Sequence, residues 1–163
     1  MSVRLERFTE KAQEALQAAV ELTREHGQQA VEPEHLLLAL VDQQEGVGRT
    51  LLERAGVSTQ ALRPALESAI ARFPRVSGAG QPYISQALNH VLEQAEKEAA
   101  QLKDEYTSTE HIVLALAGTK LLKDAGADHD ALLRALRQIR GNQRVTDPNP
   151  ESKYQAWRST AAT

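Results

Sequence analysis

A seven-residue pattern occurs twice in this chain, and the duplication constrains the fold more than any other feature. Residues 34–40 read Glu-His-Leu-Leu-Leu-Ala-Leu, and residues 110–116, which lie 76 positions later, read Glu-His-Ile-Val-Leu-Ala-Leu. Each copy is apolar on nearly every side of a helix, which is typical of a helix buried on several faces. We therefore expect two equivalent central helices, one in each half of the chain.

The duplication extends well beyond these two segments. At the same offset of 76, the apolar positions of an amphipathic helix precede each copy, pairing Phe8 with Ile84, Ala12 with Leu88, Leu16 with Leu92 and Ala19 with Ala95. After the central helices the offset falls to 70, where residues 51–56 align with 121–126, so the second copy is six residues shorter (76 minus 70). The sequence predicts an all-α fold of two tandem, pseudo-two-fold-related four-helix repeats.

The repeat boundaries follow from turn and capping residues. We place the first repeat at about 3–72, a Pro- and Gly-rich linker at 73–82 and the second repeat at about 83–140. Thr9 is expected to cap the first helix, Gly27 to end it in a left-handed conformation, and Pro64 to distort the fourth helix locally. From 141 to 163 apolar content falls, which predicts a mostly solvated tail or interdomain linker.

Composition excludes several classes of protein. Aromatic residues make up only 4% of the chain, so the core must consist of Leu, Ala, Val and Ile, which favours closely packed helices. The net charge is −3 with basic residues dispersed among acidic ones, which argues against a nucleic-acid partner. There is no cysteine, and no apolar run approaches the ~20 residues that span a bilayer. We expect a cytoplasmic protein without membrane contact.

Catalytic and metal motifs are absent or ambiguous. The chain has no Walker phosphate loop, so it cannot hydrolyse nucleotide by that device, and we do not expect an enzyme. His35 and His111 are possible zinc ligands, but neither has a second His or Cys one turn away, so a structural hydrogen bond is the favoured interpretation. Glu34 and Glu110 could act as a general acid and base, although a carboxylate at a helix start is favoured by the helix dipole alone.

A further cluster of acidic residues surrounds the start of the second central helix. Asp104, Glu105 and Glu110 could form an acidic rim for a basic or polar ligand. A solvated loop is the favoured interpretation of these residues.

The two central patterns, the opening segment 8–16 and the Ala-Gly pairs at 55–56 and 125–126 together resemble the Clp N-terminal repeat family from Val3 to about Arg140. Residues 73–78 and 141–156 resemble the internal linker and the exit linker of its ClpB branch of AAA+ disaggregases. The resemblance implies a domain that binds unfolded or aggregated polypeptides through an apolar groove with a polar edge, tethered by residues 141–163 to an AAA+ module outside this chain.

The same resemblance implies the partners of a longer parent protein. That parent would be a hexameric ring ATPase that uses ATP and Mg and works with a cooperating chaperone system, while this domain would need no cofactor. The alternative is an adaptor-docking domain of a protease-linked unfoldase of the ClpA or ClpC type.

Four residues match family positions implicated in substrate contact: Thr9, Asp104 and Glu110 as polar contacts, and Leu92 as an apolar position in the groove. Residues 109–111 also fit a phosphoarginine site of ClpC-like relatives, but Pro33 departs from that pattern in the first copy. Because Asp104 and Glu110 lie near a helix start, we expect replacement of either by alanine to alter binding while costing no more than about 1 kcal/mol of stability.

Overall fold

The computed structural model describes residues 3–44, 46–78, 80–141 and 143–151 and confirms the all-α prediction. The first half contains a short 3-10 helix and four α-helices: η1 (Leu5–Arg7), α1 (Glu10–Glu25), α2 (Pro33–Asp42), α3 (Gly48–Arg54) and α4 (Thr59–Ala71). The second half repeats this order: α5 (Gln86–Gln101), α6 (Thr109–Leu116), α7 (Lys120–Asp124) and α8 (His129–Arg140).

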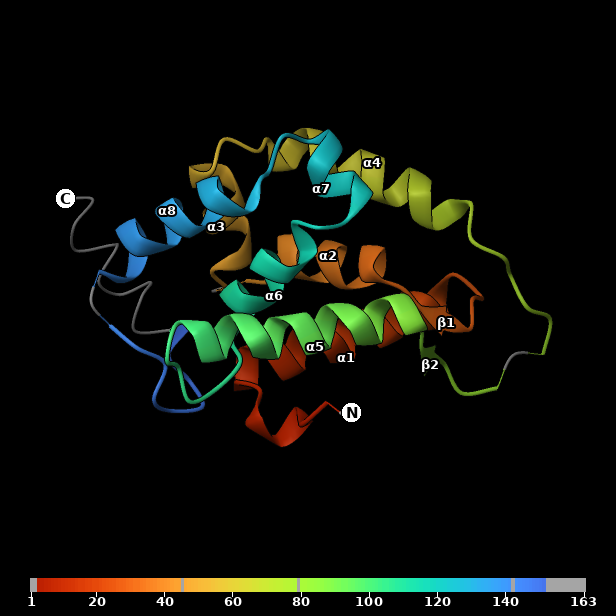
Figure 1. Cartoon of the computed structure of the whole chain (residues 1–163). Helices are drawn as coiled ribbons and strands as arrows, with labels where there is room; N and C mark the ends of the chain where they lie inside the picture. The colour runs from red at the N-terminus through yellow and green to blue at the C-terminus, as the bar shows by residue number, and fades with distance from the viewer. Residues whose placement is uncertain (1–2, 45, 79, 142, 152–163) are drawn as a thin grey trace.

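The two predicted central helices are α2 and α6, and they lie inside the molecule (Figure 1). Each is buried along nearly its whole length, as its apolar pattern predicts. α2 packs against α1 and α4, α6 packs against α5, and the halves meet through contacts of α6 with α2 and α3 and of α3 with α8. One continuous apolar core therefore spans both halves.

Both predicted ends of the first helix are confirmed. The Thr9 hydroxyl accepts a hydrogen bond from the Ala12 N–H at 3.2 Å and so caps α1, and Gly27 is left-handed with φ of 65°. The local distortion expected at Pro64 does not end the helix, because α4 is continuous through it. Pro64 lies early in the helix, where the N-terminal carbonyls can turn slightly without ending the hydrogen-bonded spiral.

Short parallel backbone pairs link the halves, a feature that the sequence did not predict. β1 (Ala30–Val31) pairs with β2 (Tyr83–Ile84), and an isolated bridge joins Phe8 to Thr107. These two contacts are related by the duplication, since Phe8 aligns with Ile84 and Val31 with Thr107. Each half thus pairs the segment before its first helix with the other half, and two-residue strands are too short to show a period in the sequence.

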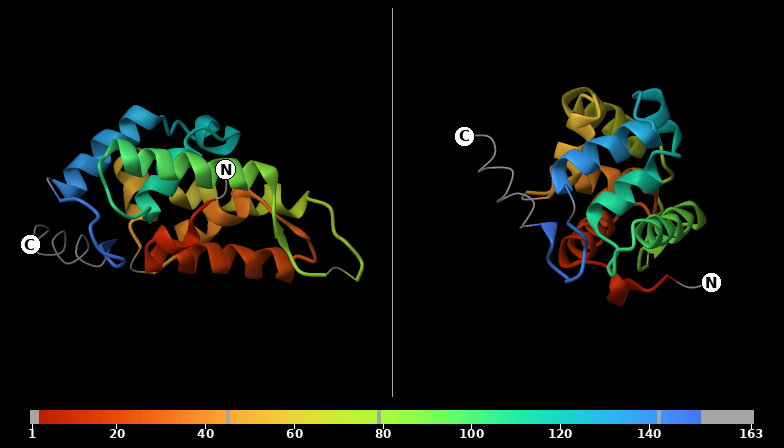
Figure 2. Two further views of the ribbon diagram at one scale, coloured as in Figure 1. Left: turned by 60° about the horizontal axis from the view of Figure 1, so that its bottom comes forward. Right: turned by 60° about the vertical axis from the view of Figure 1, so that its left-hand side comes forward.

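Most side chains of the predicted solvated tail are exposed over residues 143–151, but Val145, Pro150 and Glu151 are buried against the domain. Val145 is completely buried, and the Pro148 carbonyl accepts a hydrogen bond from the Glu10 N–H at 2.8 Å. The segment runs from the end of α8 back along the N-terminal end of α1 (Figure 2). Residue 142 and residues 152–163 lie outside the part of the chain that the structure describes.

Lys103 offers a direct test of backbone strain. It takes the left-handed position (φ 60°) that Gly27 occupies in the first half, and a side chain there is disfavoured. We expect Lys103→Gly to raise the free energy of unfolding by about 0.5–1 kcal/mol, as measured by urea denaturation. The matched control is Lys97→Gly in the middle of α5, which should instead lower stability by about 1 kcal/mol. A destabilising Lys103→Gly would contradict this account.

Candidate functional site

His35 anchors the start of α2 in the first half. Its Nδ1 accepts a hydrogen bond from the Glu32 N–H at 2.9 Å, so Nε2 carries the proton and donates to Gln28 Oε1 at 2.8 Å. Burial, with a smaller contribution from the charge of His26, lowers the pKa of His35 to about 4. The imidazole is therefore neutral near pH 7 and acts as a structural link between the helix start and the preceding loop.

His111 has the same geometry with a charged partner. Its Nδ1 accepts from the Ser108 N–H at 2.8 Å, and its Nε2 donates to Asp104 Oδ2 at 2.7 Å. Both ring nitrogens of each histidine are thus engaged within the protein. These hydrogen bonds fit the structural interpretation, and in both halves Nε2 donates to a side-chain oxygen. Among the described residues no group of three potential ligands is arranged to hold a metal ion.

Asp104 is the centre of a buried ionic network at the end of α8. Besides His111, it accepts hydrogen bonds from Arg140 Nη2 and Nη1 at 2.6 and 2.9 Å and from the Val145 N–H at 2.9 Å. Burial alone would raise the pKa of Asp104, but the hydrogen bonds from His111 and Arg140 outweigh it and lower the pKa to about 2. Asp104 is therefore ionised at neutral pH and fully paired.

A second buried polar cluster adjoins the first, at the N-termini of α1 and α6. One oxygen of the Glu151 carboxylate, Oε2, accepts from the Thr9 hydroxyl at 2.7 Å, the Thr109 N–H at 3.1 Å and the Thr109 hydroxyl at 3.3 Å. Glu110 is wholly buried beside it, with Arg140 Nη1 3.7 Å from its Oε2. Burial, and then the charge of Glu110, raises the pKa of Glu151 to about 7.

The structure thus gathers three of the four predicted substrate-contact residues and separates the fourth. Thr9 and Glu110 surround Glu151, and Asp104 is connected to them through Arg140. Leu92 lies in the core on α5 and is 2% exposed. None of the four side chains is open to solvent in this conformation, because the exit segment 143–151 covers the polar three. Their contact with substrate stays a prediction.

The other acidic candidates do not assemble into a catalytic pair. Glu34 is half-buried at the start of α2, where burial raises its pKa above the ordinary value, whereas Glu110 is completely buried. The structure shows no hydrogen bond or ion pair between them within its described residues. Glu105 is exposed, and so the acidic rim that the sequence suggested does not form around an open site.

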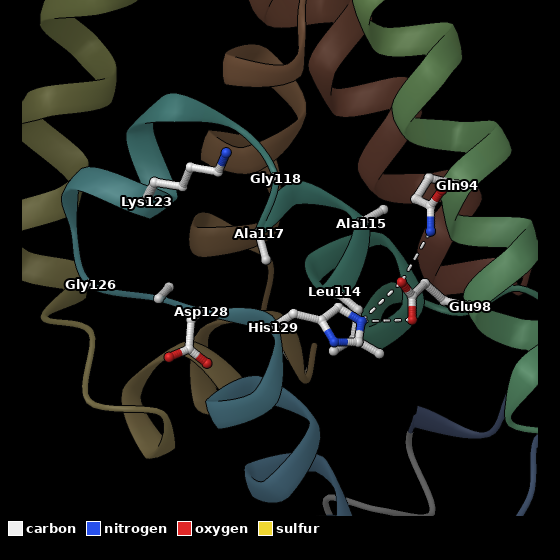
Figure 3. A pocket seen from close by; sticks show the side chains of 11 residues that line it. Gln94, Glu98, Leu114, Ala115, Ala117, Gly118, Lys123, Gly126, Asp128 and His129 are labelled. Carbon is white, nitrogen blue, oxygen red and sulfur yellow. Dashed lines mark hydrogen bonds and ion pairs between the residues drawn. The ribbon is translucent and has the colours of Figure 1, made fainter.

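An open concave surface lies elsewhere, along α5. Two adjoining hollows of about 490 and 600 Å³ share Gln94, Ala115 and Gly118. The first has a floor of small apolar side chains from α6 and the turns that flank α7, and a polar edge on which His129 pairs with Glu98 at 2.9 Å (Figure 3). The second continues to Pro33 at the start of α2, so the groove ends where the halves meet. We call these two hollows the α5 groove.

The sequence contained one signal for the α5 groove that we did not use. A related hollow of about 600 Å³ lies between α1 and α2 in the first half, but acidic side chains rim it, and the Gln43 amide in the longer loop donates to the Lys11 carbonyl at 2.8 Å. In the second half the six-residue shortening leaves a turn at Gly118 and Thr119, whose small residues extend the apolar floor. The change of offset from 76 to 70 could have identified this face.

Comparison with known proteins decides the family. Residues 7–120 match the model of the Clp repeat (R) N-terminal domain. The chain belongs to this Clp N-terminal domain family. The chaperone protein ClpB of Porphyromonas gingivalis is 46% identical over 154 residues, covering 91% of this chain but only 18% of that protein. The chain thus spans about a fifth of the length of this relative.

Solved structures show the same fold. The N-terminal domain of Hsp104 from Candida albicans matches with a TM-score of 0.76 and 26% identity, covering 89% of this chain and 99% of that one. The N-terminal domain of the ClpV1 ATPase from E. coli matches with a TM-score of 0.73 and 25% identity, covering 90% and 92%. These likenesses confirm the fold of a Clp N-terminal domain. None of the helices that the structure describes could cross a membrane.

Proposed function

We propose that this Clp N-domain is the substrate-recognition domain of an ATP-dependent disaggregase of the ClpB type. In this proposal it holds exposed apolar segments of unfolded or aggregated polypeptide in the α5 groove. The observation that carries the proposal is the groove itself, an open hollow in the second half with an apolar floor and a polar edge, which reaches Pro33 of the first half. The domain's relatives are ClpB chaperones.

The chemistry of the groove suits a client of variable sequence. Its floor of Leu114, Ala115 and Ala117 offers apolar contact without a shaped pocket for one side chain, and Gln94 and Lys123 supply adaptable hydrogen bonds at the edge. A shallow groove buries less surface than a standard interface, so a single domain should bind weakly. Several such domains around one ring would raise the effective affinity through avidity.

The rest of the assembly belongs to the same proposal. The parent protein would be a cytoplasmic hexameric ring whose AAA+ modules bind ATP and Mg, and it would act with a cooperating chaperone system. The alternative, an adaptor-docking domain of a ClpA- or ClpC-type unfoldase, would be favoured by a protease-binding loop in the second ATPase module of the longer chain. A long coiled-coil insertion after the first ATPase module would favour the disaggregase.

The test introduces a charge into the groove without disturbing the core. Ala87 is exposed on α5 and lines the groove, so Ala87→Arg should weaken binding of a fluorescently labelled, reduced and alkylated model protein by about tenfold, or ~1.4 kcal/mol. Fluorescence anisotropy would measure the affinity. The matched control, Ala100→Arg, places the same charge on an exposed position of α5 outside the groove and should leave binding unchanged. Equal affinities for the two variants would refute the groove assignment.

A further inference from the structure

The exit segment 143–151 is attached to the domain by specific backbone contacts. The Val145 carbonyl accepts from the Glu105 N–H at 2.7 Å, and the Pro148 carbonyl accepts from the Glu10 N–H at 2.8 Å. The Val145 side chain is buried among the core residues. These contacts place the segment across the N-terminal ends of α1 and α6, directly over the polar cluster that contains Thr9 and Glu110.

Glu151 makes the last contact of the segment, and its buried position is stabilised by some interactions and destabilised by others. Three hydrogen bonds bind Glu151 Oε2, yet its Oε1 accepts none from the described residues. Neither carboxylate oxygen of the neighbouring Glu110 accepts a hydrogen bond from those residues either. Burying two adjacent acidic groups that are incompletely paired is unfavourable, whereas withdrawal of Glu151 would return both to water. A contact balanced in this way can open without unfolding the helices beneath it.

We propose that residues 143–151 form a releasable strap, latched by Glu151, and that its release opens the cluster of Thr9, Thr109 and Glu110 to an unfolded polypeptide. The binding of polypeptide to this cluster rests on the proposed function, because it gives the domain a second, covered contact site in addition to the α5 groove. It also accounts for the burial of Thr9, Asp104 and Glu110, for which the family resemblance implies substrate contact. The strap blocks that site until Glu151 withdraws.

Amide hydrogen exchange, resolved by NMR in the whole chain, tests the latch without any substrate. In Glu151→Ala, the Glu10 and Glu105 amides, which are bonded to the strap, should exchange at least about tenfold faster. The Thr9 and Thr107 amides should stay protected, because they donate to the Thr107 and Arg7 carbonyls within the domain. The control is Glu105→Ala, which removes an exposed carboxylate beside the strap and should leave the Glu10, Thr9 and Thr107 amides unchanged. Equal acceleration of all four amides, or of none, would overturn the proposal.

The pH dependence of exchange provides a second readout. Four charged or titratable groups surround the latch: Glu110 and His111 on α6, Asp104 in the turn before α6, and Arg140 at the end of α8. From the start of α1 the latch meets the Thr9 hydroxyl, which carries no charge. In the seated strap the pKa of Glu151 is raised from 4.5 to about 7. Glu151 therefore binds a proton more tightly when the strap is seated than when it is released. The strap should be most firmly seated below pH ~4.5 and should open increasingly as pH rises through about 7.

Glu151→Gln separates this charge effect from loss of the side chain. Its amide is neutral at every pH and keeps an oxygen for Thr9 and Thr109, so the strap should stay seated with a flat profile once intrinsic exchange is corrected. Wild-type exchange at Glu10 that slows with rising pH would contradict the latch. Glu151→Ala should also bind the reduced, alkylated model protein several-fold more tightly than Glu151→Gln. Equal binding, with exchange at Glu10 accelerated, would remove the substrate part of the proposal and leave the strap and the α5 groove standing.

Discussion

Replacing Asp104 by asparagine should lower the free energy of unfolding by about 3–5 kcal/mol, the cost of removing one partner from a buried ion pair. The reason is Arg140, whose guanidinium is 6% exposed and hydrogen-bonded to both oxygens of Asp104. Asparagine would remove the carboxylate to which both guanidinium nitrogens are hydrogen-bonded and leave the more distant one of Glu110, 3.7 Å away. The sequence alone predicts a loss of no more than about 1 kcal/mol, which applies to an exposed charge near a helix start. In the structure the Asp104 side chain is buried, so a larger loss is expected.

Urea denaturation at pH 7 and at lower pH would measure the effect. Because the pKa of Asp104 is lowered from 3.8 to about 2, its contribution is complete above pH ~4 and is lost as pH falls toward 2. The difference between wild type and Asp104→Asn should therefore shrink over that interval. Glu105→Gln, at an exposed carboxylate next to it, should change stability by less than about 0.5 kcal/mol. A similarly small loss for Asp104→Asn would show that the network contributes little.

The duplication explains why so much of the fold could be predicted. Two copies of one apolar pattern must bury the same faces, so the sequence located both central helices and the residues that flank them. Caps such as Thr9 and Asp128 also act locally, through a side chain and an N–H three residues later, and local contacts can be read from spacing. Information of this kind does not depend on tertiary structure.

The candidate site was harder to predict because its geometry depends on contacts distant in sequence. Thr9 and Glu151 are 142 residues apart, and Asp104 and Arg140 are 36 apart, with no pattern that pairs them. A polar residue beside a predicted helix start was taken to be exposed, yet the strap buries it. The strap itself has little apolar content apart from Val145, and its burial follows from a few specific hydrogen bonds.

Leu38→Ala and Leu114→Ala should each lower the free energy of unfolding by about 2–5 kcal/mol, since each removes most of a buried side chain from a central helix. Leu38 is 4% exposed and Leu114 1%, and both belong to the same apolar core although they lie in different halves. Because α6 packs on both α2 and α3, a cavity in one half weakens the surface against which the other half folds. Either variant should therefore shift one cooperative transition of the whole domain.

Urea denaturation, monitored by far-UV circular dichroism and by NMR signals from each half, would measure the loss of stability. It would also show whether the two halves unfold in one transition. Leu5→Ala is the control, because Leu5 is 45% exposed and its truncation should cost less than about 0.5 kcal/mol. If Leu38→Ala shifted the transition of the first half and left the second unchanged, the halves would be independent folding units. We expect coincident transitions, because the backbone pairs of Val31 with Ile84 and of Phe8 with Thr107 tie each half to the other.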